Sequence, residues 1–156
     1  MAASSGAWTR STTEQSVAQL PTETRAAIDR HLDEVAGVTG VLDAVTGVWH
    51  TVSAKKGGLL KKAQTVSQWV LLGPEWLVWV AHDTSRAVTP HDVTTARLRD
   101  VRVRDYETSS LAKLQPDTGV SVLAQAGGPE SSEVFLGLGP EPAARQLRER
   151  LHAATA

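Results

Sequence analysis

Cysteine is absent from this chain of 156 residues, and aromatic residues are scarce. Without cysteine there is no disulfide framework, no thiol nucleophile and no cysteine-ligated zinc site. One Phe and one Tyr accompany five Trp, so the core must consist mainly of Val and Leu. A formal charge of -1 argues against a general nucleic-acid binder. No apolar run is long enough for a signal-peptide core or a membrane-spanning helix, so we expect a cytoplasmic protein.

Sequence motifs that mark catalysis are also missing. The chain contains no G-x-S-x-G nucleophile elbow, no G-x-x-x-x-G-K-[ST] phosphate loop and no H-E-x-x-H zinc motif. The pairs His82-Asp83 and His91-Asp92 keep a small metal-dependent hydrolase as a third hypothesis, although both pairs look like loop residues and turn starters. We therefore expect a non-catalytic protein that binds no metal and no cofactor.

The N-terminal third of the sequence favours helix. Residues 1–20 are mostly small and polar, which predicts a disordered N-terminus. Residues 21–36 then predict a helix, because Pro21 suits a first turn, apolar residues recur at helical spacing, and Gly37 is a suitable stop.

Residues 38–54 also fit the helical period, so we expect residues 21–54 to form a helical arm. Gly37, Gly40, Ala44 and Gly47 form a stripe of small residues at the start of and along the second predicted helix. Helices with such a stripe pack closely against other helices, which raises the hypothesis of a homodimer through 38–54.

Strand signals dominate residues 63–156. Residues 68–72 and 75–81 predict a hairpin around Gly73-Pro74, and two later strands, 120–126 and 133–138, flank a turn at 127–129. Alternation in 93–107 slips by one residue after Leu98, which predicts a β-bulge at Arg99-Asp100. A helix over 140–153, with Leu147 and Leu151 on one apolar stripe, closes the chain.

This order of short antiparallel strands closed by an amphipathic helix resembles the pleckstrin-homology (PH) superfold. The details are similar to bacterial PH-like and GRAM-like domains, with an aromatic-rich second hairpin strand, here 75–81, and a kinked strand, here 98–103. The resemblance covers residues 63–156. It implies an α+β fold, a small curved antiparallel β-barrel or sandwich of PH-like type, capped by the C-terminal helix and preceded by the helical arm.

A basic segment, residues 55–62, is expected to link the arm to this domain. Lys55, Lys56, Lys61 and Lys62 could contact an anionic membrane, with Leu59 and Leu60 entering the interface. In many PH domains a basic loop near the first hairpin binds phosphoinositide. The alternative is a solvated hinge without a ligand.

A second candidate anion site consists of Arg97, Arg99, Arg102 and Arg104. These arginines would line one face of a strand if the chain bulges between Leu98 and Val101. The alternative is a solvated strand face paired with acidic neighbours across the sheet.

Three tryptophans, Trp69, Trp76 and Trp79, form the candidate protein-binding site. Trp76 and Trp79 are three residues apart and must point to opposite faces of a strand, so one is core and the other is exposed or covered by the helix 38–54. The leading hypothesis is therefore an adaptor that binds an unknown protein partner. The alternative is peripheral binding to anionic lipid at the inner face of the membrane.

Overall fold

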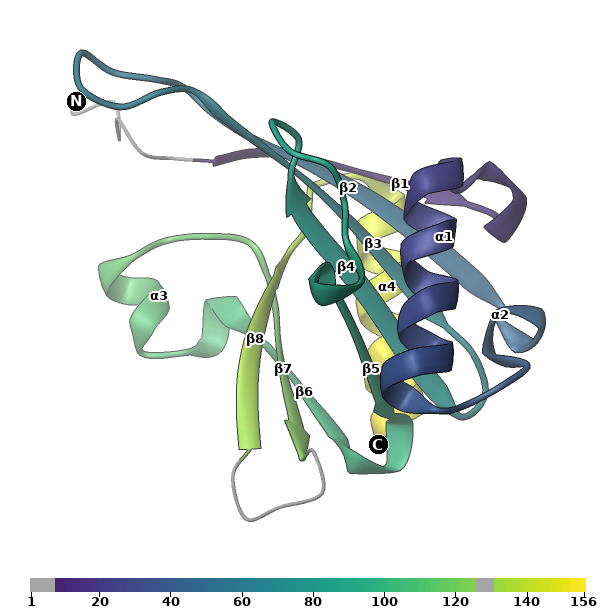
Figure 1. The fold of residues 1–156 in the computed structure, drawn as a ribbon. Coiled ribbons are helices and arrows are strands. Elements are labelled where there is room, and N and C mark those ends of the chain that lie inside the picture. Colours follow the sequence, from purple (N-terminus) through teal and green to yellow (C-terminus); the bar gives the residue numbers. More distant parts are fainter. Residues whose placement is uncertain (1–7, 126–130) are drawn as a thin grey trace.

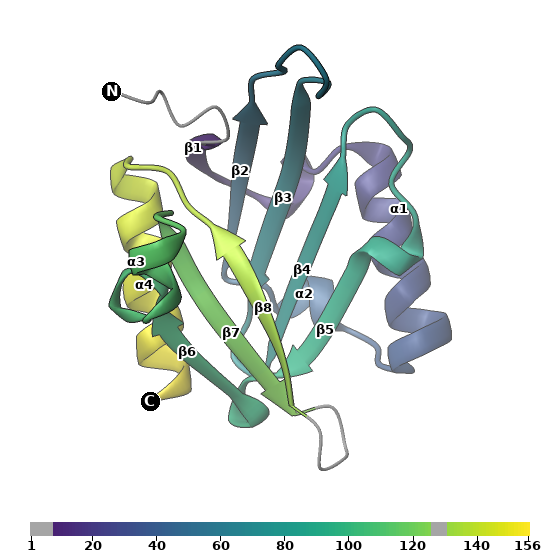
Figure 2. The ribbon, with the colours of Figure 1, turned by 90° about the vertical axis from the view of Figure 1, so that its left-hand side faces the viewer.

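The computed structural model describes residues 8–125 and 131–156, which form an α+β fold with two antiparallel sheets and a C-terminal helix. Helix α1 (Thr22–His31) covers the outer face of the larger sheet. The smaller sheet and helix α4 (Pro142–Thr155) lie on the inner side (Figure 1, Figure 2). Within the described residues the two sheets do not close into one barrel.

The larger sheet contains five strands in chain order, each antiparallel to its neighbours. The predicted hairpin is confirmed, because Leu72 pairs with Leu77 across the turn at Gly73-Pro74. The turn closes with a hydrogen bond of 3.0 Å from the Gly73 N–H to the Trp76 carbonyl. The strands are β1 (Trp8–Gln15), β2 (Gly47–Lys55), β3 (Gln64–Leu72), β4 (Trp76–Asp83) and β5 (Val93–Arg97).

The smaller sheet contains three strands in the order β6-β7-β8. The strands predicted at 120–126 and 133–138 are confirmed within the described residues, and the turn predicted at 127–129 lies outside them. A short helix, α3 (Leu111–Leu114), precedes β7. The strands are β6 (Val101–Asp105), β7 (Gly119–Gln125) and β8 (Ser131–Gly137).

A 3-10 turn, Leu98–Asp100, replaces the β-bulge predicted at Arg99-Asp100. The turn carries the chain from β5 in the larger sheet to β6 in the smaller sheet. Leu98 and Val101 both remain in the core, with exposed fractions of 6% and 3%. The slip in alternation therefore marks a change of sheet, since one extra residue turns the strand while both apolar side chains stay inside.

Helix α4 closes the inner core, as its apolar stripe predicted. Leu147 and Leu151 are fully buried and belong to one apolar cluster with Trp49, Trp79 and Leu136. Arg148 fixes the helix to the smaller sheet, because its guanidinium donates hydrogen bonds to Asp105, Glu107 and the Gly119 carbonyl.

Residues 8–15 form strand β1, so the prediction of a disordered segment over 1–20 is wrong for these residues. β1 pairs with β2 from Trp8 opposite Lys55 to Gln15 opposite Val48. Thr12 is its one buried residue and hydrogen-bonds the Thr51 hydroxyl at 2.8 Å. Polar residues thus form an edge strand. Because its partner strand lies far along the chain, the sequence of residues 8–15 carries no local signal of this pairing.

Helix α1 confirms the first predicted helix and continues as a π-helical turn, Leu32–Ala36. The chain leaves the helix at Gly37, whose φ of 63° is left-handed. Ala27, Ile28 and Leu32 pack on the outer face of the larger sheet in a second apolar cluster.

The helix predicted over 38–54 is wrong. Only α2 (Val41–Ala44) is helical there, and β2 begins at Gly47. Gly40 has a left-handed φ of 75°, which interrupts a continuous helix. Both faces of β2 are covered, since Val48 lies in the outer cluster and Trp49 in the inner cluster. Apolar residues on both faces remove the alternation of a half-buried strand, so the sequence of β2 also fits a helical period. The helix face that the homodimer hypothesis requires is therefore absent.

Candidate functional site

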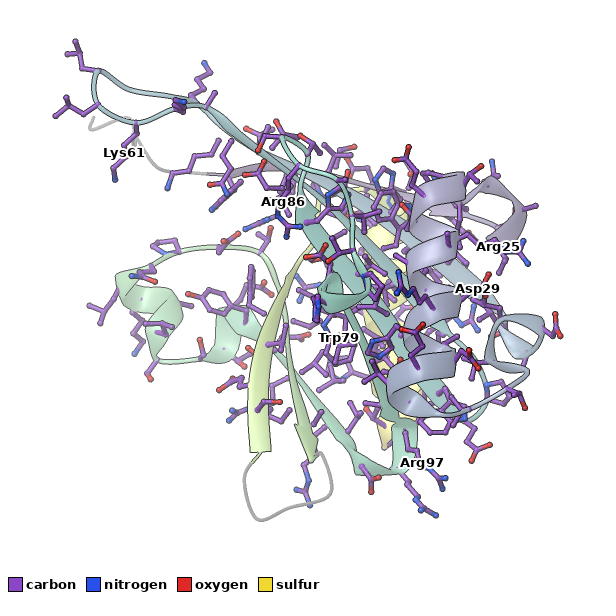
Figure 3. All side chains as sticks on the ribbon, viewed as in Figure 1. Arg25, Asp29, Lys61, Trp79, Arg86 and Arg97 are labelled. Atoms are coloured by element: carbon purple, nitrogen blue, oxygen red, sulfur yellow. The ribbon has the colours of Figure 1, made fainter. Side chains whose placement is uncertain are left out.

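The basic segment forms the end of the hairpin that joins β2 to β3. Lys55 pairs with Gln64 as the last pair of a nine-residue ladder, and the loop continues beyond the sheet. Figure 1 shows this loop projecting from the body of the molecule, and Figure 3 places Lys61 at its end. The segment predicted as a linker between two regions thus connects neighbouring strands of one sheet. Residues 55–62 are called the hairpin tip below.

Two glycines shape the hairpin tip. The Gly58 N–H donates a hydrogen bond of 2.8 Å to the Lys61 carbonyl, which closes the loop. A Cβ atom on Gly57 would lie 2.6 Å from the Ala63 nitrogen, so the backbone approaches too closely for any other residue. The fold of the loop places the two residues between the lysine pairs at its outer end.

Those two residues are leucines against which no apolar cluster of residues 8–125 and 131–156 packs. Leu59 and Leu60 have exposed fractions of 106% and 100%, and neither belongs to an apolar cluster of the fold. Leaving two leucine side chains fully in water forgoes about 1.5–3 kcal/mol each relative to burial. Adjacent exposed leucines of this kind indicate a contact surface.

The hairpin tip is also strongly positive. Its four lysines lie in a stretch from Ala44 to Pro74 that contains no Asp or Glu. Lys56, Lys61 and Lys62 are exposed, and Lys55 is half-buried with its ammonium 5.6 Å from the centre of the Trp8 ring. Trp8 also contacts Arg10 at 5.3 Å. No local sequence pattern marks Trp8 as a site residue, because only the pairing of β1 with β2 brings it beside the lysines.

The four candidate arginines do not share one strand face, so that prediction is wrong. Arg97 ends β5, where its guanidinium lies 5.0 Å from the Trp76 ring and 3.9 Å from a Glu75 oxygen. Arg99 lies in the 3-10 turn, and Arg102 and Arg104 lie on β6 in the other sheet. Figure 3 shows Arg97 at the end of the molecule opposite Lys61. The arginines are therefore separate from the hairpin tip.

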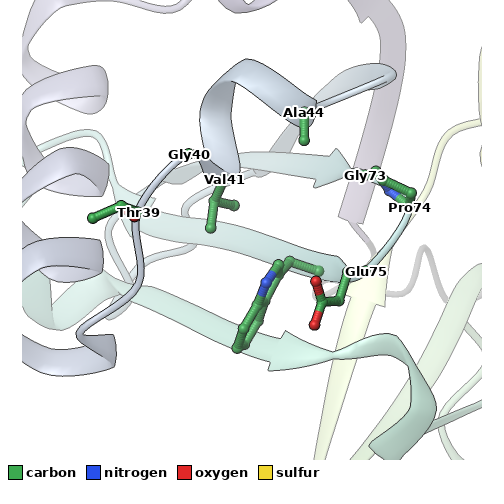
Figure 4. A pocket seen from close by; sticks show the side chains of 8 residues that line it. Thr39, Gly40, Val41, Ala44, Gly73, Pro74 and Glu75 are labelled. Atoms are coloured by element: carbon green, nitrogen blue, oxygen red, sulfur yellow. The ribbon is translucent and has the colours of Figure 1, made fainter.

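Two of the three candidate tryptophans are core residues. Trp69 and Trp79 are each 4% exposed and pack in the outer and inner clusters, respectively. A partner that docks on the folded surface would not reach them. Trp76 is half-buried and lines a cavity of ≈ 110 Å³ with Val41 and Ala44 of α2 (Figure 4). It remains the one member of this candidate site with accessible surface.

Two histidines in the larger sheet and its covering helix predict a dependence of stability on pH. Burial lowers the pKa of His50, which stacks on Trp69 with ring centres 4.4 Å apart. Burial also lowers the pKa of His31, although a hydrogen bond with the Pro90 backbone opposes this. The unfolded chain therefore binds more protons below about pH 6.5. The free energy of unfolding therefore has its full value above that pH. It falls as the pH drops toward the pKa values that the two histidines have in the folded state.

Urea unfolding checks this prediction. We expect a lower midpoint at about pH 5.5 than at about pH 7.5. The Arg86 guanidinium lowers the pKa of Asp92 to about 2, so that carboxylate does not titrate in this range. The variant His50→Gln should show a smaller pH dependence. Equal midpoints for the native chain at both pH values would contradict the assignment.

The structure engages the two His-Asp pairs in local contacts and does not gather them into one ligand cluster. Within residues 8–125 and 131–156, no group of three His, Asp or Glu side chains is placed to hold a metal ion. Asp92 caps its own turn by accepting the Thr89 N–H at 2.8 Å and also binds Arg86. His82 stacks on Trp69 with ring centres 6.0 Å apart.

Comparisons with family models, curated proteins and solved structures give no match to this chain. None of the described helices has the length and apolar character needed to cross a membrane. The only support for a site at the hairpin tip is therefore the geometry and charge of its own residues.

Proposed function

We propose that this protein is a PH-like module that binds anionic membrane surfaces peripherally through the hairpin tip. The strand order supports the PH-like part. From β2 onward, four strands of one sheet precede three strands of a second sheet and the closing helix α4. This order corresponds to the seven strands and C-terminal helix of the PH superfold, with β1 and α1 added before it. In that arrangement β2 and β3 form the first hairpin, where many PH domains carry a basic lipid-binding loop.

The complete exposure of Leu59 and Leu60 between lysine pairs carries the membrane proposal. Stable peripheral binding takes two signals, such as apolar insertion and a basic patch. Each lysine near an anionic leaflet contributes about 1 kcal/mol, and each inserted leucine about 1.5–3 kcal/mol. The hairpin tip offers both on one projecting loop. The inner leaflet of the membrane is rich in anionic lipid, so its charge is complementary to that of the hairpin tip.

The alternative of binding a protein through the tryptophans has less support, because Trp69 and Trp79 are buried. A basic loop without exposed leucines would equally suit a solvated hinge. The two fully exposed leucines between the lysine pairs favour contact with the apolar part of a membrane over a loop that stays in water.

Vesicle flotation tests the proposal. The native chain should float with phosphatidylcholine vesicles that contain phosphatidylserine and should remain unbound with phosphatidylcholine alone. Binding should weaken between low salt and about 0.15 M salt, because ions screen the lysines. The double variant Leu59→Ser/Leu60→Ser should lose about 100-fold in affinity, since about 3 kcal/mol of apolar transfer disappears.

The matched control is Leu111→Ser/Leu114→Ser, which removes two other leucines that are 49% and 81% exposed. This control should bind the vesicles like the native chain. Absence of flotation, or equal binding by the Leu59→Ser/Leu60→Ser variant, would reject membrane insertion by the hairpin tip.

A further inference from the structure

A hollow of ≈ 250 Å³ opens between helix α1 and the segment that leads into α2. Its lining includes the buried Leu32 and Val41 and the partly buried Val38 and Leu42. The smaller cavity that Trp76 lines also contacts Val41, so the two adjoin (Figure 4). Since a cavity of about 150 Å³ already accommodates a benzene ring, this α1–α2 hollow has room for branched apolar side chains.

The rim of the α1–α2 hollow is acidic on two sides. Asp29 and Asp33 lie four residues apart on the α1 side, and Asp43 lies on the opposite side in α2. All three side chains are exposed. Arg25 also borders the hollow, 4.0 Å from Asp29, and three carboxylates against one guanidinium leave the rim negative. The rim is therefore suited to a basic partner.

The hairpin tip of the same chain has the complementary pattern. Leu59 and Leu60 lie between two lysine pairs, and the hollow has apolar residues between aspartates on its two sides. When the four lysines of the tip are set aside, the 16 basic residues of the chain fall to 12, against 17 acidic ones. A positive tip on an acidic body favours contact between copies of the chain.

The hairpin tip and the hollow lie far apart within one molecule. Figure 3 shows Lys61 at the tip and Asp29 beside the hollow on opposite sides of the protein. The tip ends a nine-residue ladder that directs it away from α1 (Figure 1). A contact between tip and hollow therefore joins two copies head to tail. Because the two surfaces differ, such contacts extend into an open chain or close into a ring.

We propose that this protein self-associates head to tail, with the hairpin tip of one copy seated in the α1–α2 hollow of the next. Leu59 and Leu60 contact the apolar lining, and the lysine pairs face the aspartates on both sides. The contact removes from water two leucine side chains that a single copy leaves fully exposed. The charges around them set the orientation of the contact.

Self-association and membrane binding use the same side chains of the hairpin tip. A tip that is seated in a neighbouring copy cannot enter a membrane, so each tip takes part in one contact or the other. Anionic vesicles should therefore disperse the assemblies. The association itself does not rest on the membrane proposal, because it is measured without vesicles.

Sedimentation velocity at low salt tests the proposal. The average mass of the native protein should rise above that of one chain with increasing concentration. It should fall again at about 1 M salt, where the screening length is about 3 Å. The variant Leu59→Ser/Leu60→Ser should weaken the association about tenfold or more, because the apolar contact is lost. The matched control, Leu111→Ser/Leu114→Ser, should associate like the native chain.

Reversal of three exposed charges on either surface gives a sharper test. The tip variant is Lys56→Glu/Lys61→Glu/Lys62→Glu, and the hollow variant is Asp29→Lys/Asp33→Lys/Asp43→Lys. Each should sediment as a monomer, because like charges then face each other. An equal mixture should associate again, since the acidic tip of one variant meets the basic hollow of the other. Both variants should keep the native urea midpoint, because the substituted side chains are exposed.

Two results would overturn the proposal: a native chain that stays monomeric up to millimolar concentration, or a mixture of the two variants that stays monomeric. The proposal would also fail if the control Glu14→Lys/Asp100→Lys/Glu149→Lys lost the association. That control makes the same change of net charge as the hollow variant, at exposed positions outside the hollow. Flotation distinguishes these failures from failure of the membrane proposal, because the hollow variant keeps its tip and should float with anionic vesicles at least as well as the native chain.

Discussion

Replacing Lys55, Lys56, Lys61 and Lys62 together by glutamate should lower the affinity for anionic vesicles by about a thousandfold or more. Four lysines near the leaflet supply about 4 kcal/mol in total, and each factor of ten corresponds to about 1.4 kcal/mol. Glutamates at the same positions also repel the leaflet. The loss should appear as absence of flotation at every salt concentration tested. Three of the four side chains are exposed, so the fold should persist.

The control for this experiment carries the same change of net charge at sites outside the hairpin tip. Arg25, Arg30, Arg99 and Arg145 are exposed and suit this purpose. Their replacement by glutamate should weaken flotation only slightly, through the long-range field of the protein. If both quadruple variants lose binding equally, net charge and not the hairpin tip would govern the association.

The second large effect concerns stability. Leu147→Ala should lower the free energy of unfolding by about 3–5 kcal/mol, because Leu147 is fully buried where α4 meets both sheets. The loss combines the missing apolar contacts with a cavity that the neighbouring strands cannot fill. Urea unfolding followed by circular dichroism measures it.

The same substitution at Leu114, which is 81% exposed in α3, is the control and should cost less than about 0.5 kcal/mol. A loss below about 1 kcal/mol for Leu147→Ala would mean that α4 does not close the core. Because stability and vesicle binding depend on different residues, Leu147→Ala should leave the vesicle affinity of the folded fraction unchanged.

Local signals predicted the elements that carry them. Helix α4 combines a proline in its first turn with apolar residues four apart, and the β3–β4 hairpin contains Gly73-Pro74 between two apolar runs. Each of these patterns is complete within about fifteen residues, so it can be recognised without knowing the neighbours in space. The buried positions of Leu147 and Leu151 followed from the same pattern.

The strands β1 and β2 could not be recognised in this way. β2 is buried on both faces, which removes the alternation that identifies a strand. β1 is polar and gains its structure from a partner more than thirty residues away. A helix over the residues of β2 turns residues 55–62 into a predicted linker, although their lysines and leucines alone indicate a candidate lipid site. Trp8 reaches the lysines only through the long-range pairing of β1 with β2, so no local pattern marks it as a site residue.

The isolation of the hairpin tip from both apolar clusters has a consequence for engineering. Residues 56–62 are all exposed and lie in a loop that projects beyond every described helix and strand in Figure 1. The ladder from Gly47 opposite Leu72 to Lys55 opposite Gln64 holds the two ends of the loop together. The loop is therefore a graft site: another recognition sequence can replace it at little cost in loop-closure entropy, which changes slowly with length. The scaffold can then be retargeted without redesigning its core.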